Sequence, residues 1–214
     1  MSNSNDVNGN KQMHDKRAFK RKFCLGDVEI VKTFVGEKPL KRVIYTQDFC
    51  DYYLLKTKKK LRKMGGYIES ADCLSQTDLS VVTDSAKVMG QSQVTNNAIV
   101  SGDAEILNSV VKGFAVVSDC AYIFNSHIDD CAYVGRATVY HSTIKGNAFI
   151  VSVGEYFNCD IGGDMRIVGP VDLKDITTNV DAVISSGYYV NQNQFNKAIE
   201  QYYQECDEEY LLQK

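Results

Sequence analysis

The sequence predicts a mainly β protein whose central part is a single-stranded, three-sided parallel β-helix. Two observations predict this fold. Val and Ile recur at steps of five or six residues from Val82 to Ile167, and three successive steps add up to 16–18 residues. Three short strands joined by tight corners make one coil of that length, whereas an α-helix repeats every 3.6 residues and a half-buried strand every two.

The chain before the β-helix divides into a tail and a small β unit. Residues 1–22 are rich in Asn, Ser, Asp and Lys, so we expect a flexible polar and basic tail. Residues 23–64 contain two runs with β-branched residues, Val28–Val31 and Val43–Thr46, which predict a hairpin. The same unit ends in the basic run Lys56–Lys63.

The β-helix itself is expected over residues 65–170. Its apolar positions sort into three sides, and fifteen of the sixteen positions are Val or Ile. The first side stacks Val82, Val100, Val117, Val134, Ile150 and Ile167. The second stacks Val88, Ile106, Ile123, Val139 and Tyr156, and the third stacks Val94, Val111, Ile128, Ile144 and Ile161. Because stacked coils pair their strands about 4.8 Å apart, these side chains are expected to fill a common shaft.

Small residues mark the expected corners of the coils. Two residues before many shaft positions stands an alanine or serine: Ala86, Ser92, Ala98, Ala104, Ala115, Ala121, Ala132 and Ala148. A second pattern recurs every 16–17 residues and consists of a large apolar or aromatic residue, then Asn or His, then Ser or Cys. Its first members directly follow shaft residues and should point outward. Phe124, Tyr140 and Phe157 are therefore expected to form an exposed aromatic stripe that binds a partner.

Beyond the repeat, residues 171–192 predict an irregular connection and residues 193–214 a C-terminal α-helix. Asn193 is a suitable N-cap for this helix. The apolar residues with helical spacing are Phe195, Ile199, Tyr202 and Cys206. We expect the helix to cover an edge or an end of the solenoid. The alternative is that it contacts a partner or another copy of the chain.

The opening of the repeat resembles a known protein group. Three segments carry the similarity: Gly65-Gly66-Tyr67-Ile68-Glu69-Ser70, Leu74-Ser75-Gln76, and hexads such as Asp84-Ser85-Ala86-Lys87-Val88. In these segments the chain resembles the YdcK-type hexapeptide-repeat proteins of bacteria and prophages. The similarity covers residues 65–106 well and the later coils loosely, where five-residue steps depart from the hexad. The resemblance implies a left-handed β-helix, and it carries over no activity.

Composition and charge exclude some classes of protein. No run of 18 apolar residues would span a membrane, and the polar N-terminus lacks the apolar core of a secretory signal, so we expect a cytoplasmic or phage-associated protein. The seven cysteines form no C-x-x-C pair and are expected to be reduced. Residues 1–66 carry 16 basic and 7 acidic residues, a net charge of +9, whereas residues 67–214 carry 8 and 20, a net charge of −12.

Two histidines are the candidate catalytic residues. Acyltransferases with hexapeptide repeats place a histidine base at a coil corner, which makes His141 and His127 the candidates. His141, however, occupies the place of Asn108, Asn125 and Asn158 in sister coils, and a hydrogen-bonding role in a ladder is the favoured explanation for it. His127 is expected on the surface beside a shaft residue. The sequence predicts no metal site, since it contains three histidines of which one lies in the expected tail, and it predicts no cofactor.

The sequence therefore predicts a non-catalytic scaffold that uses flat β-helix faces for protein binding or assembly. Self-association, for example as a homotrimer, belongs to this prediction, and membrane contact does not. The first alternative is an acyl-CoA-dependent acyltransferase with His141 as the base. The second is nucleic-acid contact through the basic run, which could instead be a solvated face or pair with Asp207–Glu209. The candidate binding residues of the run are Lys58, Lys59, Lys60, Arg62 and Lys63.

Overall fold

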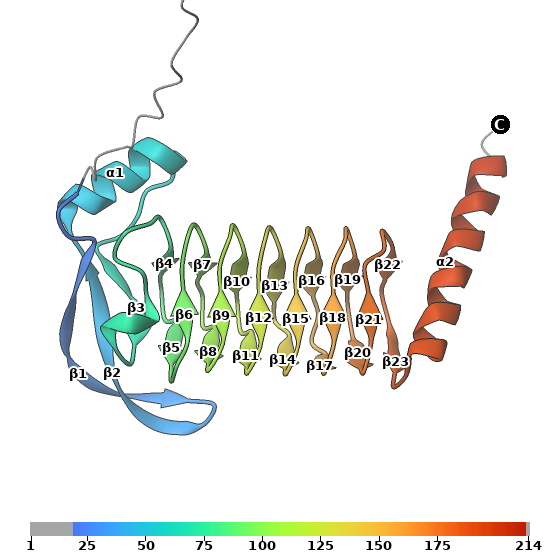
Figure 1. Ribbon diagram of the computed structural model, residues 1–214, viewed down its shortest axis with the longest axis horizontal. Coiled ribbons are helices and arrows are strands. Elements are labelled where there is room, and N and C mark those ends of the chain that lie inside the picture. The colour runs from blue at the N-terminus through green and yellow to red at the C-terminus, as the bar shows by residue number, and fades with distance from the viewer. Residues whose placement is uncertain (1–18, 213–214) are drawn as a thin grey trace, which may run out of the picture.

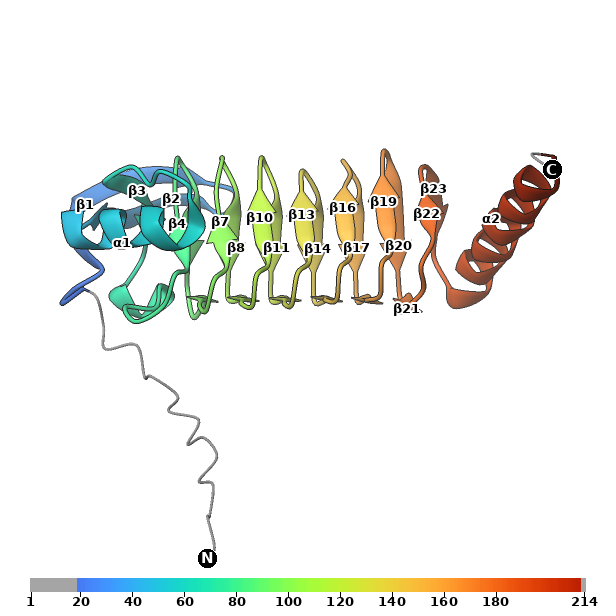
Figure 2. The same cartoon turned by 90° about the horizontal axis from the view of Figure 1, so that it is seen from above.

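The computed structural model describes residues 19–212, with side chains described as far as Cys206, and it confirms a β-solenoid between an N-terminal unit and a C-terminal helix (Figure 1). The coils follow one another along one axis, with helix α1 (Gln47–Thr57) at one end and helix α2 (Gln192–Leu212) at the other (Figures 1 and 2). Successive coils add strands to three sheets, here named A, B and C. The winding sense implied by the resemblance stays a prediction.

Sheet A has ten strands and also includes the N-terminal hairpin. In spatial order its strands are β1 (Phe23–Thr33), β2 (Gly36–Tyr45), β3 (Met64–Ile68), β5 (Lys87–Met89), β8 (Glu105–Leu107), β11 (Tyr122–Phe124), β14 (Thr138–Tyr140), β17 (Glu155–Phe157), β20 (Val171–Lys174) and β23 (Gly187–Tyr189). The β1–β2 and β2–β3 pairs are antiparallel, and the pairing is parallel from β3 onward.

Sheets B and C consist of solenoid strands alone. The strands of sheet B are β6 (Gln93–Val94), β9 (Val110–Val111), β12 (His127–Ile128), β15 (Thr143–Ile144), β18 (Asp160–Ile161) and β21 (Thr177–Thr178). The strands of sheet C are β4 (Val81–Val82), β7 (Ile99–Val100), β10 (Val116–Ser118), β13 (Tyr133–Gly135), β16 (Phe149–Val151), β19 (Arg166–Val168) and β22 (Val183–Ile184). A short 3-10 helix, η1 (Ala71–Cys73), precedes β4.

The predicted Val and Ile positions line the interior of the solenoid. Val134, for example, pairs in register with Val117 on one side and with Ile150 on the other. All sixteen predicted shaft side chains have an exposed fraction of 0%. In-register parallel pairing places like side chains above one another, so neighbouring coils share one apolar core. Burial of each such side chain contributes about 2 kcal/mol before the entropy of ordering the chain is counted.

The corner between sheets A and B repeats one backbone conformation and one hydrogen bond. Its corner residues have positive φ, between 46° and 55°, and are Asn108, Asn125, His141, Asn158 and Asp175. Asn, Asp and His are the residues that tolerate this region best after glycine. Next to them runs a column of buried serines, in which the backbone N–H of Ser142 donates to Oγ of Ser126 over 3.1 Å. The column gives the buried N–H groups of this corner a partner.

The N-terminal unit contains the predicted hairpin and also a helix that the sequence did not indicate. Helix α1 occupies part of the segment expected to be β structure. The side chain of Thr46 caps it by accepting from the backbone N–H of Phe49 over 3.3 Å, and Lys58 ends it with a φ of 61°. Phe49 and Tyr53 are buried beneath the helix, so its packing outweighs the strand preference of its aromatic residues.

The expected tail is shorter than residues 1–22. Residues 1–18 lie outside the described part of the chain. Phe19 and Lys22 are both buried, and the Phe19 ring lies 5.0 Å from the ring of Phe49. Residues 19–22 are therefore part of the folded unit. The buried ring of Phe19 holds this segment against helix α1, although the residues around it are polar.

The solenoid continues where an irregular connection was expected. Strands β20–β23 extend it to Tyr189, and the spacing persists after Ile167, since Leu173, Thr178 and Ile184 follow at steps of six, five and six. The shaft positions of this last coil are no longer all Val or Ile, since Leu173 and Thr178 stand among them. Helix α2 then begins at Gln192, one residue earlier than expected, and Oδ1 of Asn191 rather than of Asn193 accepts from a backbone N–H of its first turn, that of Gln194, over 3.1 Å.

Helix α2 covers part of the last coil, as expected. Phe195 and Ile199 are buried there, and the helix leads away from the coil toward its C-terminal end (Figure 1). Neither helix within residues 19–212 has the length and apolar character needed to cross a membrane.

Candidate functional site

The outer face of sheet C is far more apolar than the outer face of sheet B. The residues that directly precede its shaft positions are Ile99, Val116, Tyr133, Phe149, Arg166 and Val183. The corresponding residues of sheet B are Gln93, Val110, His127, Thr143, Asp160 and Thr177. Because side chains alternate between the two sides of a strand, both sets point outward. Five of the six positions are apolar in sheet C, but only one is apolar in sheet B.

The later coils extend this surface. Val151 and Val168 follow their shaft residues and add a second apolar row, and Val168 and Val183 are 43% and 39% exposed. The rings of Tyr133 and Phe149 stack with centroids 5.0 Å apart, and the guanidinium of Arg166 lies 5.1 Å from the Phe149 centroid. We call Ile99, Val116, Tyr133, Phe149, Val151, Arg166, Val168 and Val183 the sheet C face.

Exposed apolar residues also stand at both corners beside the sheet C face. Phe114, 65% exposed, lies just before β10, and Val153, 64% exposed, lies just after β16. From β7 to β22 the face spans about 24 Å along the solenoid and about 10 Å across the strands, at ordinary strand dimensions. At these dimensions the face covers roughly 240 Å², and the exposed corner residues extend it toward the roughly 300–600 Å² of the largest apolar patch on a typical monomer.

The N-terminal hairpin covers the first part of the outer face of sheet A. Its tip residue Phe34 donates its backbone N–H to Oε2 of Glu105 over 2.7 Å, and its ring lies 5.3 Å from the ring of Tyr122. The other carboxylate oxygen of Glu105 accepts from Nζ of Lys87, also over 2.7 Å. These contacts place the hairpin tip over the first part of the outer face of sheet A, as far as Tyr122.

The predicted aromatic stripe lies on this outer face. Phe124 and Tyr140 are half-buried with ring centroids 6.0 Å apart, and Phe157 is 44% exposed. A pocket of about 440 Å³ opens beside the later part of the stripe. Its principal side chains are Tyr140, Glu155, Phe157, Asp172, Lys174 and Tyr188. A role of the stripe in binding stays a prediction.

His141 borders this pocket and a neighbouring one of about 320 Å³. Its ring lies edge-on to Phe124 and Phe157, at centroid distances of 5.9 and 5.8 Å. Within the described residues, its side chain makes no hydrogen bond. A histidine base is oriented by a hydrogen bond at its second ring nitrogen, and His141 has none here.

His127 and Lys112 contact the same carboxylate, that of Asp129. Nε2 of His127 lies 3.5 Å from Oδ2 of Asp129, and Nζ of Lys112 lies 3.1 Å from the same oxygen. His127 lies on β12 of sheet B, whereas His141 lies at the corner after β14, and no hydrogen bond or ring contact joins the two candidate catalytic residues within the described chain. Among the described residues, no three His, Cys, Asp or Glu side chains are placed to hold a metal ion.

The basic run lies at the N-terminal end of the solenoid. Lys58, Lys59, Lys60, Arg62 and Lys63 are all exposed where the chain leaves α1. Helix α2, which carries Asp207–Glu209, lies at the other end (Figure 1). The side chains of Asp207–Glu209 lie outside the described part of the chain, so their pairing with the run stays a prediction. Contact of the run with nucleic acid stays a prediction.

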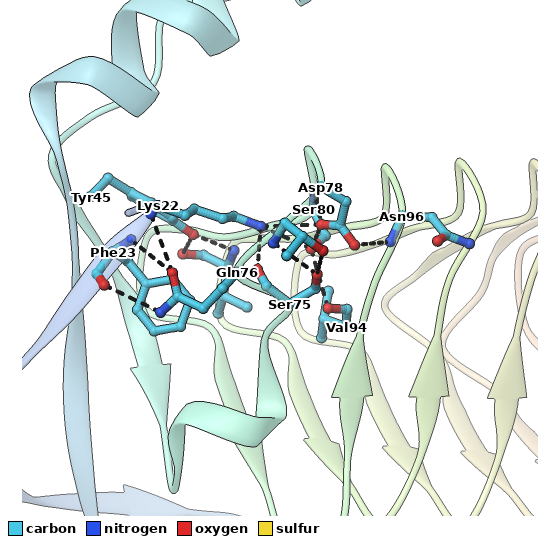
Figure 3. Close-up of polar contacts among 11 residues, drawn as sticks. Lys22, Phe23, Tyr45, Ser75, Gln76, Asp78, Ser80, Val94 and Asn96 are labelled. Atoms are coloured by element: carbon cyan, nitrogen blue, oxygen red, sulfur yellow. Dashed lines mark hydrogen bonds and ion pairs between the residues drawn. The ribbon is translucent and has the colours of Figure 1, made fainter. Parts of the chain in front are cut away.

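Sequence reasoning did not find a buried lysine at the junction between the hairpin and the first coil (Figure 3). Nζ of Lys22 donates to the carbonyl oxygen of Ser75 over 2.8 Å and to Oγ of Ser80 over 3.1 Å, and it lies 3.3 Å from Oδ1 of Asp78. Burial lowers the pKa of Lys22 to about 8, although Asp78 acts in the opposite direction. The amine has no exposed surface, so this cluster joins two parts of the fold and does not meet a ligand.

No protein-family model matches the chain, and none of the curated proteins matches it in sequence.

Proposed function

We propose that this chain is a non-catalytic assembly protein that self-associates through the sheet C face. The observation that carries the proposal is the ladder of apolar side chains outside the shaft of sheet C, which has no counterpart on sheet B. Burying side chains of this kind is the main driving force of protein association. The YdcK-type resemblance and a trimeric state are compatible with this proposal and stay predictions.

The regular spacing of the face favours a second copy as its partner. Its rows repeat at the strand spacing of about 4.8 Å, because each coil contributes one rung. A partner that fills the spaces between successive rungs must present side chains at the same repeat. Another copy of the same solenoid does so along its whole length.

The size of the face predicts an association of moderate strength. A stable interface buries about 800 Å² on each partner, and the face with its corners offers less than this. We therefore expect a concentration-dependent oligomer. Arg166 is compatible with such a contact, since a guanidinium stacks on aromatic rings and is only weakly hydrated.

The experiment compares two charge substitutions in one coil. Phe149 and Thr143 both directly precede shaft residues, the first on sheet C and the second on sheet B. Phe149→Glu should convert the wild-type oligomer into a species of 23.9 kDa in light scattering, whereas Thr143→Glu should leave the oligomer intact. A folded Phe149→Glu protein with the wild-type mass would overturn the proposal.

The geometry gives the acyltransferase alternative less support. A general base works when a partner fixes its ring and when it reaches the acceptor. His141 borders two pockets, which favours ligand contact, but it lacks that partner among the described residues. The scaffold function needs neither a fixed tautomer nor a cofactor.

A further inference from the structure

We propose that the open part of sheet A binds a neutral carbohydrate in the pocket beside the aromatic stripe. The pocket volume of about 440 Å³ lies in the range of small-molecule sites. This inference concerns a different surface from the sheet C face and does not depend on self-association.

The pocket has two rows of outward side chains that run across the strands. Glu155, Asp172 and Tyr188 precede their shaft residues, and Tyr140 and Phe157 follow theirs. Residues two apart on a strand lie about 7 Å from each other, so a shallow channel separates the rows. The hairpin tip closes the outer face at Tyr122, and no such cover lies over these later strands within the described chain.

The charged groups in the pocket point to a neutral ligand. Glu155 and Asp172 would repel an anion, and Lys174 offsets part of their attraction for a cation. No ion pair joins Lys174 to either carboxylate in the described structure; its Nζ lies 5.9 Å from the centre of the Phe157 ring. Both kinds of charged group therefore remain available to a ligand. Asp172 is held in place, because its Oδ1 accepts from the backbone N–H of Glu155 over 2.7 Å.

The same groups have the hydrogen-bonding capacity that sugar hydroxyls need. A hydroxyl both donates and accepts, whereas an ionised carboxylate accepts only and an ammonium donates only. The pocket offers the two carboxylates and Lys174 for these roles. Phe157 and Tyr188, 44% and 68% exposed, offer ring faces, whose negative quadrupole attracts the C–H groups of a pyranose ring. A ligand with hydroxyls and an apolar face satisfies both sets of groups.

Calorimetry with defined oligosaccharides tests this inference. The probes are neutral hexasaccharides of glucose, N-acetylglucosamine, mannose and galactose, with a sulfated hexasaccharide and a hexalysine peptide as charged comparisons. We expect at least one neutral probe to bind. Phe157→Ala and Asp172→Asn should each weaken that binding by about tenfold or more.

Leu55→Ala is the control, because Leu55 is also a large apolar residue, 64% exposed, but lies on helix α1 at the other end of the solenoid. It should leave the affinity unchanged, and Tyr188→Ala should lower it. Melting curves verify that each variant is folded. The inference is overturned if no neutral probe binds, if only a charged probe binds, or if folded Phe157→Ala and Tyr188→Ala proteins bind as tightly as the wild type. None of these outcomes bears on the mass measured for Phe149→Glu.

Discussion

Nζ of Lys22 lies 3.3 Å from Oδ1 of Asp78, in a place where no part of the Lys22 side chain reaches solvent. The folded protein thus keeps a charged amine at a junction between its N-terminal unit and its first coil. Burial moves the pKa of this amine from 10.5 to about 8, against the opposing effect of Asp78. The stability of the protein must therefore depend on pH.

The first prediction concerns this dependence. Between about pH 8 and pH 10 the unfolded chain keeps the Lys22 proton that the folded chain has lost, so the free energy of unfolding rises with pH. Relative to Lys22→Met, the wild type should gain roughly 2–3 kcal/mol across this window, as measured by urea denaturation. Tyr45, whose pKa is raised by burial, is present in both proteins and cancels. A constant difference between the two proteins would contradict the assignment.

The second prediction separates the inside of the solenoid from its outside. Val134 is fully buried between Val117 and Ile150, so Val134→Asp places an unpaired charge in the shaft and should cost more than about 4 kcal/mol. Thr138→Asp, on the outer side of the next strand, should cost far less. Thermal and urea denaturation measure both. Equal losses would show that the inward and outward positions are assigned incorrectly.

The third prediction concerns the serine column. Oγ of Ser126 accepts from the N–H of Ser142 and donates to the carbonyl of Phe124 over 2.8 Å. Ser126→Ala leaves a buried N–H without a partner and should cost about 1–3 kcal/mol. Ser126→Cys should be milder, because Cys159 occupies the same column with its Sγ 3.3 Å from a carbonyl oxygen. Urea denaturation compares the two variants, and a costlier Cys than Ala would argue against the column as a source of stability.

The fourth prediction concerns His141. Its φ of 48° matches the values of 46° at Asn125 and 53° at Asn158, so His141→Asn should change stability by no more than about 0.5 kcal/mol. Calorimetry with acetyl-CoA should give no binding heat with the wild type. Binding or turnover that the wild type shows and His141→Asn lacks would favour the acyltransferase alternative.

The sequence predicted the shaft because every coil has buried positions that require an apolar side chain. Val117, Val134 and Ile150 recur at spacings of 17 and 16 residues, and the structure places them in one column. The spacing also continues through Leu173 and Thr178, but their different residue types hid the last coil. Reading the spacing alone would have found it.

Other features could be predicted only in part. The sheet C face has a signal in the sequence, since Tyr133 and Phe149 directly precede shaft residues. The prediction considered only the residues that directly follow shaft positions, which form the aromatic stripe, and so it missed this face. Helix α1 has a cap in Thr46, although its aromatic residues favour a strand. Lys22 gave no signal, because its burial depends on Asp78 and Ser80, more than fifty residues away in sequence.

Sedimentation velocity of the wild-type chain over a range of concentrations tests the proposed self-association most directly. We predict a species of at least twice 23.9 kDa that dissociates on dilution, and a Phe149→Glu protein that sediments as a monomer at every concentration. A wild-type protein that remains a single 23.9 kDa species at the highest concentration would contradict the claim that the sheet C face joins copies of this chain.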